Sequence, residues 1–210
     1  MISTKTNFKK NEKRIDNMSD AKGKIIIING VSSSGKTTLS KGLQQKMEEH
    51  YFWVANDTFC DMCSSKHWNE DWVTRINQAL TAMIYSVKSF SDLGFNVIVD
   101  QVFLNNASQG KILEKCIEVL HDYPVLFVRT DCSLEELKKR EKERGNRRIG
   151  QAESQLKIVH NHNTYDIAID TTKNDTDENI NKIILKLENI EDRRAFSILY
   201  DKLSTTGKIY

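Results

Sequence analysis

The segment Gly30-Val31-Ser32-Ser33-Ser34-Gly35-Lys36-Thr37 decides the fold of this 210-residue chain. Its spacing, a glycine, four residues, Gly-Lys and then a threonine, is the pattern of a phosphate-binding loop. Residues 24–29 before it read Lys-Ile-Ile-Ile-Ile-Asn, a β-branched run that is typical of a strand buried on both faces. After it, apolar residues recur at helical spacing, at Leu39, Leu43 and Met47. A strand, a glycine-rich loop and a helix in this order predict a nucleotide-binding site.

The residue types in this loop suit a bound triphosphate. Gly30 and Gly35 lack a Cβ, so the backbone can turn and approach the phosphates closely. The loop N–H groups and the N-terminus of the following helix then supply donors and positive potential. We expect Lys36 to reach the β- and γ-phosphates and the Thr37 hydroxyl to bind Mg²⁺. The predicted nucleotide-binding residues of this segment are Gly30, Val31, Ser32, Ser33, Ser34, Gly35, Lys36, Thr37 and Thr38.

Length and composition suit one domain with a sizeable core, since 39% of the 210 residues are apolar and 29% are charged. No apolar run approaches the ~20 residues that a membrane span needs. Residues 1–22 are basic and polar, without the apolar region of a secretory signal. We therefore expect a cytoplasmic protein with no membrane partner. The net charge of +2 gives the whole chain no strong attraction to nucleic acid.

Five short apolar segments alternate with amphipathic segments along the chain, at about residues 24–29, 51–55, 95–99, 124–129 and 165–170. This alternation predicts an α/β fold, a three-layer α/β/α architecture in which helices cover both faces of a five-stranded parallel sheet. We expect a disordered basic arm over residues 1–22, one domain over 23–190, and a helical extension over 191–210. Monomer and homo-oligomer both stay open.

Two carboxylates follow predicted strands, at the edge of the sheet where ligands of such folds bind. Asp100 closes an apolar strand, where a phosphate-loop protein places the carboxylate that holds Mg²⁺. Asp57 closes the second strand, and a carboxylate there can accept the proton of an incoming hydroxyl, which contributes roughly 10²- to 10⁴-fold. The competing interpretations are that Asp100 only caps the end of its strand and that Asp57 is an ordinary loop aspartate. Asp61 lies close enough in sequence to be confused with Asp57.

Four arginines, Arg140, Arg144, Arg147 and Arg148, surround Gly145 in a polar segment. Arginines on a mobile lid, here about residues 140–152, can close over the phosphates and meet charge that spreads over the transferred group. A well-placed arginine supplies about 10³-fold or more in such systems. Closure also excludes water, which protects the nucleotide from hydrolysis. The alternative is a solvated basic helix end that complements the helix dipole.

The chain resembles the chloramphenicol phosphotransferase-like branch of the P-loop kinases, which are relatives of shikimate and adenylate kinases. The resemblance rests on Ile-Asn-Gly-Val-Ser-Ser-Ser-Gly-Lys-Thr at 28–37, Asp57, Val-Asp-Gln-Val-Phe-Leu at 99–104, Arg-Glu-Lys-Glu-Arg-Gly-Asn-Arg at 140–147, Val-His at 159–160 and Tyr-Asp-Ile-Ala-Ile-Asp-Thr-Thr at 165–172. It implies a P-loop kinase fold with a helical lid, and ATP and Mg²⁺ as cofactors. The implied reaction is phosphorylation of a hydroxyl on a small molecule, for example an antibiotic such as chloramphenicol.

The same resemblance implies Lys36 and Asp57 as catalytic residues, Asp57 being the base, with Arg144 and Arg147 in the lid. It also implies that Arg140 and Arg144 contact the nucleotide. Two positions depart from the family pattern. Gln101 stands where a second acidic residue often follows Asp100, and Asn146 stands where an aspartate is usual in the lid. These departures leave the identity of the acceptor open.

Other patterns keep further functions in view. Residues 172–175, Thr-Lys-Asn-Asp, match a relaxed guanine-recognition pattern, which favours a nucleotide-dependent switch or binding module. However, Phe103 occupies the glycine position of a GTPase switch, so we interpret 172–175 as a turn and helix cap. The basic arm favours a kinase that acts on nucleic acid or protein.

Cysteines, histidines and tryptophans give weaker signals. Cys60 and Cys63 form a lone Cys-x-x-Cys, which is more typical of structural thiols than of a zinc site. His160 and His162 lack a carboxylate partner in sequence that would favour a metal site. Three tryptophans belong either to an acceptor pocket or to the core, and these are Trp53, Trp68 and Trp72.

Overall fold

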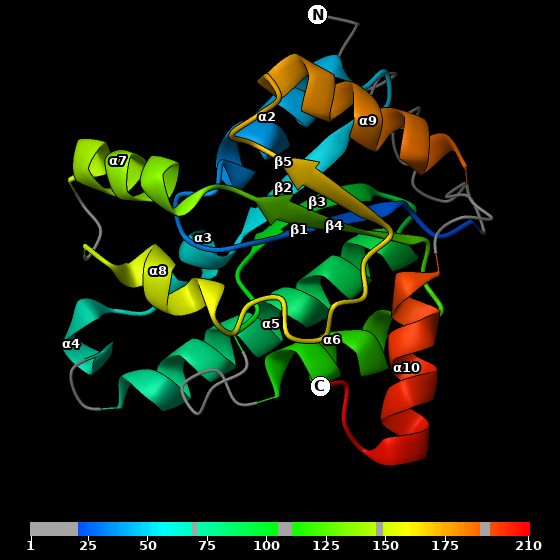
Figure 1. Cartoon of the computed structure of the whole chain (residues 1–210). Helices are drawn as coiled ribbons and strands as arrows, with labels where there is room; N and C mark the ends of the chain where they lie inside the picture. The colour runs from blue at the N-terminus through cyan, green and yellow to red at the C-terminus, as the bar shows by residue number, and fades with distance from the viewer. Residues whose placement is uncertain (1–20, 69–70, 105–110, 146–148, 190–193) are drawn as a thin grey trace, which may run out of the picture.

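The computed structural model describes residues 21–68, 71–104, 111–145, 149–189 and 194–210 (Figure 1). Its centre is a parallel sheet with the strand order β2-β3-β1-β4-β5. The strands are β1 (Ile25–Asn29), β2 (Tyr51–Ala55), β3 (Asn96–Gln101), β4 (Val125–Asp131) and β5 (Ile167–Asp170). The predicted α/β fold with a five-stranded parallel sheet is confirmed. Residues 1–20 of the expected basic arm lie outside the described residues.

Helices cover both faces of this sheet. The helices are α2 (Lys36–Lys46), α3 (Asn56–Asp61), α4 (Ser65–Trp68), α5 (Trp72–Asp92), α6 (Ile112–Leu120), α7 (Leu134–Arg144), α8 (Gln151–Leu156), α9 (Thr176–Glu188) and α10 (Ala195–Thr206). Helices α5, α6 and α10 pack on one face, and α2 and α9 pack on the other. Helices α7 and α8 lie beyond the carboxyl ends of the strands, on the left of Figure 1.

The isoleucine run of β1 supplies both halves of the core. Ile25 and Ile27 join the cluster under α5, α6 and α10, whereas Ile26 and Ile28 join the cluster under α2 and α9. All four are at most 1% exposed. Burying an isoleucine side chain fully stabilises a fold by roughly 1.5–3 kcal/mol. This run therefore places β1 between β3 and β4, and fixes the loop that follows it at the centre of the carboxyl edge.

A third, smaller cluster joins that loop to α7 and α8. Its buried members are Val31 from the loop, Leu137 from α7, Ala152 from α8 and Val159. Because Val31 packs between the two helices, the bases of α7 and α8 are attached to the phosphate-binding loop.

Residues after 194 add to the core on the α6 side of the sheet. Phe196, Leu199 and Ile209 are buried there, and the Phe196 ring packs edge-on against Phe127 of β4 with centroids 5.2 Å apart. In the described part of the chain, no helix is both long enough and apolar enough to cross a bilayer.

Candidate active site

Two residues with positive φ shape the loop between β1 and α2. Ser33 has a φ of 63° and Gly35 a φ of 90°, and such turns direct successive N–H groups toward one side. Gly30 meets a different requirement, because a Cβ there would overlap the hydroxyl of Thr130 on β4. The loop backbone therefore has the concave shape of an anion-binding nest.

Hydroxyl groups at the ends of β4 and β5 hold the loop. The Thr130 and Ser34 hydroxyls are 2.8 Å apart, and the Thr171 hydroxyl donates to the Ser34 carbonyl at 2.9 Å. The Ser33 hydroxyl, in contrast, is buried and has no hydrogen-bond partner in the described part of the chain. A buried hydroxyl left unpaired costs about 1–3 kcal/mol. A phosphate oxygen in the nest would satisfy it, so the loop fits the triphosphate that its sequence predicts.

Lys36, Thr37 and Asp100 lie together at the start of α2. The Lys36 ammonium donates to the Val31 carbonyl at 2.8 Å and lies 4.0 Å from a carboxylate oxygen of Asp100. The Thr37 hydroxyl donates to the other Asp100 oxygen at 2.6 Å. The described residues contain no cluster of three or more His, Cys, Asp or Glu that could cage a metal. A hydroxyl beside one carboxylate fits Mg²⁺, which typically takes few protein ligands and completes its shell with phosphates and water.

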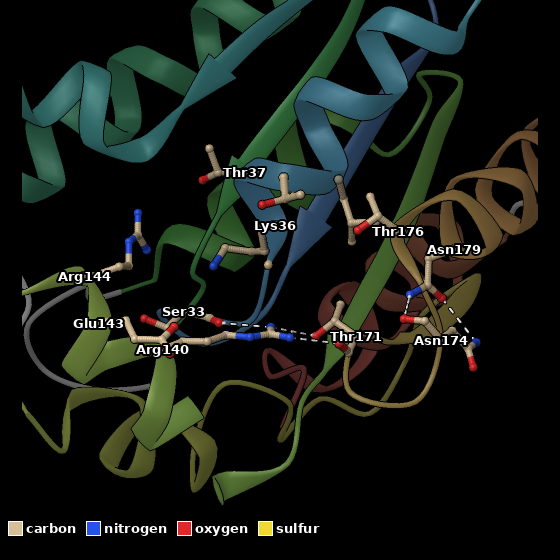
Figure 2. Close-up of a pocket in the computed structure, with 13 residues that line it drawn as sticks. Ser33, Lys36, Thr37, Arg140, Glu143, Arg144, Thr171, Asn174, Thr176 and Asn179 are labelled. Atoms are coloured by element: carbon tan, nitrogen blue, oxygen red, sulfur yellow. Dashed lines mark hydrogen bonds between the residues drawn. The ribbon is translucent and has the colours of Figure 1, made fainter. Parts of the chain in front are cut away.

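A cavity of about 550 Å³ opens beside these residues, between α2, α7 and the β5–α9 turn (Figure 2). Lys36 and Thr37 lie on its α2 side, and Thr38 is also in its wall. Arg140 reaches from α7 across the base of the cavity to Thr171, and Asn174 and Asn179 lie beyond (Figure 2). The shape suits a nucleotide whose phosphates enter the nest.

Arg140 is held in place by the protein itself. Its guanidinium donates to the Thr171 carbonyl at 2.9 Å and to Glu136 at 2.9 Å, and approaches the Ser33 carbonyl at 3.5 Å. Arg140 is thus hydrogen-bonded to the phosphate-binding loop and to the β5–α9 turn, and the mobile-lid interpretation of the arginine cluster stays a prediction. Arg144, one turn later on α7, is exposed. Arg147 and Arg148, and Asn146, lie outside the described residues.

A second cavity, of about 840 Å³, lies on the other side of Lys36. Asp57 of α3 is in its wall, together with Asp100 and Arg144. The two cavities share four residues, and these are Ser33, Lys36, Thr37 and Arg144. The two cavities therefore meet at these four residues.

Comparison with known proteins matches residues 23–188 to the family model described as chloramphenicol phosphotransferase-like protein. The chain belongs to the chloramphenicol phosphotransferase-like family. Two sequences from strains of Mycobacterium tuberculosis, named as candidate O-phosphotransferases, are 27% identical over 174 residues, which covers 71% of this chain and 76% of theirs. Membership of this family makes the protein an enzyme, a phosphotransferase of the P-loop kinase type.

Solved structures share the fold of this phosphotransferase. Shikimate kinase from Acinetobacter baumannii, in complex with shikimate, has a TM-score of 0.59 at 15% identity, over 80% of this chain and 94% of that one. The Mycobacterium tuberculosis APS kinase, in complex with AMPPNP and APS, has a TM-score of 0.57 at 17% identity, over 80% and 99%. The predicted P-loop kinase fold is thus confirmed.

The sequence predicted that Asp57 ends the second strand, and this prediction was wrong. Strand β2 stops at Ala55, and Asn56 begins α3 directly, so Asp57 lies in the first turn of that helix. Asp61 follows one turn later and also lines the second cavity. Burial and the nearby carboxylates of Asp57 and Asp61 raise the pKa of the Cys60 thiol to about 11. Cys60 is therefore a protonated thiol in the cavity wall at neutral pH.

Aromatic and apolar side chains form much of the remaining wall of the second cavity. Trp53 and Trp72 both line it, and Trp72 is 50% exposed. Both tryptophans therefore lie in a cavity wall, and Trp53 also packs against the core under α2, while their contact with an acceptor stays a prediction. The side chain of Trp68 lies outside the described structure.

Two buried polar residues at the base of the lid escaped sequence reasoning. Glu141 of α7 accepts hydrogen bonds from the backbone N–H groups of Gly150 and Ala152, at 3.0 and 2.7 Å. Gln155 of α8 accepts one from the backbone N–H of Ser32, at 2.7 Å. The available signal was a glutamate four residues after the apolar Leu137, at a position that a helix turns toward its core.

Two of the five histidines, His160 and His162, contact aromatic residues within the fold. The Tyr165 hydroxyl lies 2.7 Å from His160 Nδ1 and accepts from the Asn29 amide at 2.7 Å, behind the phosphate-binding loop. His162 stacks on Phe127. Burial lowers the pKa of both imidazoles to about 4, so both are neutral at physiological pH.

The turn at 172–175 is a helix cap, as predicted. The Asp175 carboxylate accepts from the backbone N–H of Glu178 at 2.7 Å, which is the bond of an N-cap at the start of α9. The Asn174 amide donates to Asn179 at 3.3 Å. The Asn174 and Asp175 side chains are therefore engaged within the protein.

Proposed function

We propose that this protein transfers the γ-phosphoryl group of ATP to a hydroxyl of a small molecule. The nucleotide would occupy the cavity between α2, α7 and the β5–α9 turn, and the acceptor would occupy the larger cavity beside Asp57. The observation that carries the proposal is the shared wall. Lys36, Thr37 and Arg144 border both cavities, whereas Asp57 borders only the larger one. A phosphoryl group at Lys36 would thus face a carboxylate across an acceptor-sized space.

Each residue then has a chemical role. ATP supplies the phosphoryl group, whose bond to the bridging oxygen breaks as the bond to the acceptor oxygen forms. Asp57 accepts the proton of the acceptor hydroxyl and holds that hydroxyl in line with the phosphoryl group. General-base catalysis of this kind accelerates a reaction by roughly 10²- to 10⁴-fold. Lys36 and Arg144 neutralise charge on the transferred group, a role in which Arg147 is expected to join. Arg140 and the phosphate-binding loop would hold the nucleotide in a fixed position relative to the acceptor.

Magnesium would sit at the Thr37 and Asp100 oxygens. When bound there, the ion would neutralise charge that develops on the phosphates during transfer. Thr37 and Asp100 are already 2.6 Å apart, so the chain places both oxygens at one point without rearrangement of the backbone.

The acceptor is proposed to be a small molecule because of the size of its cavity. About 840 Å³ lies within the range of about 300–1,000 Å³ that small-molecule pockets occupy. The mixture of Trp72, Ile76 and Leu104 with carboxylates suits an amphipathic alcohol. An antibiotic such as chloramphenicol is one such alcohol, and the cytoplasm, where ATP is abundant, is the proposed compartment.

The experiment is an ATP-consumption screen over antibiotics, sugars and nucleosides, with the phosphorylated product identified by mass. Asp57→Asn is then expected to lower kcat by about 10²- to 10⁴-fold while ATP affinity changes little. Asp61→Asn is the matched control, because Asp61 lies one turn later on α3 and lines the same cavity. Full turnover in Asp57→Asn would remove Asp57 from the mechanism, and no product with any acceptor would refute the transferase.

A further inference from the structure

One peptide group of the phosphate-binding loop is held at both of its polar ends. The peptide that joins Val31 to Ser32 donates its N–H to the side-chain oxygen of Gln155 at 2.7 Å. Its carbonyl accepts from the Lys36 ammonium at 2.8 Å. Both bonds are buried, and the Gln155 side chain comes from α8, more than a hundred residues later in the chain.

Peptide geometry couples these two bonds. A trans peptide is a rigid plane in which the N–H and C=O groups point in opposite directions. Fixing the N–H of Ser32 therefore aims the carbonyl of Val31, and the third core cluster holds the Val31 side chain so that the plane has little freedom to translate. Gln155 thereby helps to aim the Val31 carbonyl, which also accepts from the backbone N–H of Ser34 at 3.3 Å.

We propose that Gln155 is a positioning residue for Lys36, acting through the Val31–Ser32 peptide. The proposal rests on the nucleotide site described above. Lysine carries its charge on a flexible four-carbon stem, so its ammonium needs fixed partners to stay in one place. The Val31 carbonyl, at 2.8 Å, is one such partner, and it is closer to the ammonium than the Asp100 carboxylate at 4.0 Å.

Removal of the Gln155 acceptor has a defined consequence. The Ser32 N–H would be left buried without a partner, since Gln155 is only 7% exposed and shields it from water. The peptide would rotate to find another acceptor, and the Val31 carbonyl would turn away from Lys36. The ammonium would then lose its position beside the phosphates.

Gln151 is a matched control. It lies four residues earlier on α8 and lines the same large cavity as Gln155. Among the described residues, its side chain forms no hydrogen bond with the phosphate-binding loop, although its backbone carbonyl accepts from Ser154. The same substitution at 151 and 155 therefore separates the loop contact from any general effect on α8.

The experiment is a double-mutant cycle on the affinity for a non-hydrolysable ATP analogue with Mg²⁺, without acceptor. Gln155→Met, which keeps length and removes the acceptor, is expected to weaken binding about tenfold, equivalent to about 1.4 kcal/mol. In a Lys36→Ala background the same substitution should weaken it less than about twofold, because the group that it positions is gone. Gln151→Met should change affinity less than about twofold in either background.

Equal weakening by Gln155→Met in both backgrounds would overturn the proposal, because Gln155 would then act independently of Lys36. If Gln155→Met does not fold, as judged by circular dichroism, Gln155→Asn replaces it, since its amide is too short to reach Ser32. If the effects of Gln155→Met and Lys36→Ala on nucleotide affinity are coupled but the acceptor screen gives no phosphorylated product, the role of Gln155 stands and the proposed transferase function is rejected. If the two effects are additive and product forms, the transferase function stands and the role of Gln155 is rejected. If the wild-type protein does not bind the ATP analogue, both proposals are rejected.

Discussion

The buried carboxylate of Glu141 provides a sharp test of how the lid is built. Its two oxygens accept from the N–H groups of Gly150 and Ala152, at 3.0 and 2.7 Å, and the residue is only 1% exposed. Helix α8 begins at Gln151 after Gly150, which has no side chain to cap it. Glu141 therefore caps α8 from α7, across the segment that contains Arg144.

Glu141→Ala removes both acceptors at once. A hydrogen bond to a charged group contributes about 1.5–3 kcal/mol, so two of them predict a loss of about 3–6 kcal/mol in the free energy of unfolding. Glu141→Gln keeps one oxygen acceptor and is expected to lose about half of that. The substitution can also destabilise α8 alone, so that this helix unfolds locally. The backbone amide of Ala152 would then exchange its hydrogen faster.

Urea denaturation followed by circular dichroism measures the first quantity, and amide hydrogen exchange measures the second. Glu143→Ala is the control, because Glu143 lies on the same helix but is exposed, and surface substitutions usually stay within about 0.5 kcal/mol. If Glu141→Ala unfolds like the control and the Ala152 amide exchanges at its wild-type rate, the cap is not formed in solution.

Three further changes have expected outcomes. Asp100→Asn removes a charged oxygen from the proposed metal site at Thr37. The Mg²⁺ concentration that gives half-maximal binding of an ATP analogue should therefore rise at least about tenfold. An unchanged midpoint in calorimetry would contradict this. Leu199→Ala should cost about 2–5 kcal/mol of unfolding free energy in urea, because the side chain is fully buried in α10, and a loss below about 1 would show that α10 does not pack as described. Because burial lowers the pKa of His160 and His162 to about 4, the unfolded chain binds protons first as pH falls, so urea titrations should show stability level above about pH 7 and decreasing from about 6.5 to 4. His162→Phe should make that decrease shallower.

The fold was predictable because its signals are local. The isoleucine run and the glycine loop specify a central strand and the helix after it within some 25 residues, and the cap at Asp175 is read from adjacent residues. Thr37 and Asp100 were placed at one edge by topology alone, because parallel strands bring their carboxyl ends together. The structure puts their oxygens 2.6 Å apart.

The rest of the site depends on contacts that no local pattern encodes. Gln155 bonds to Ser32, 123 residues away, and Arg140 bonds to Thr171, 31 residues away. Both pairings follow from how α7 and α8 pack on the loop, which side-chain spacing does not determine. Asp57 was misplaced at a strand end because α3 begins without a side-chain cap, so the sequence carries no start signal there. The roles of Asp57, Arg144 and Arg147 stay proposals.

Helix α10 has a consequence for the catalytic edge. The family match ends at residue 188, yet α10 braces β4 through Phe196 and Phe127. Thr130 lies three residues further along β4, and its hydroxyl is hydrogen-bonded to the hydroxyl of Ser34 in the phosphate-binding loop. A substitution at Phe196, outside the matched residues, is therefore expected to reach the phosphate-binding loop through β4 without any change in the sequence of the loop itself.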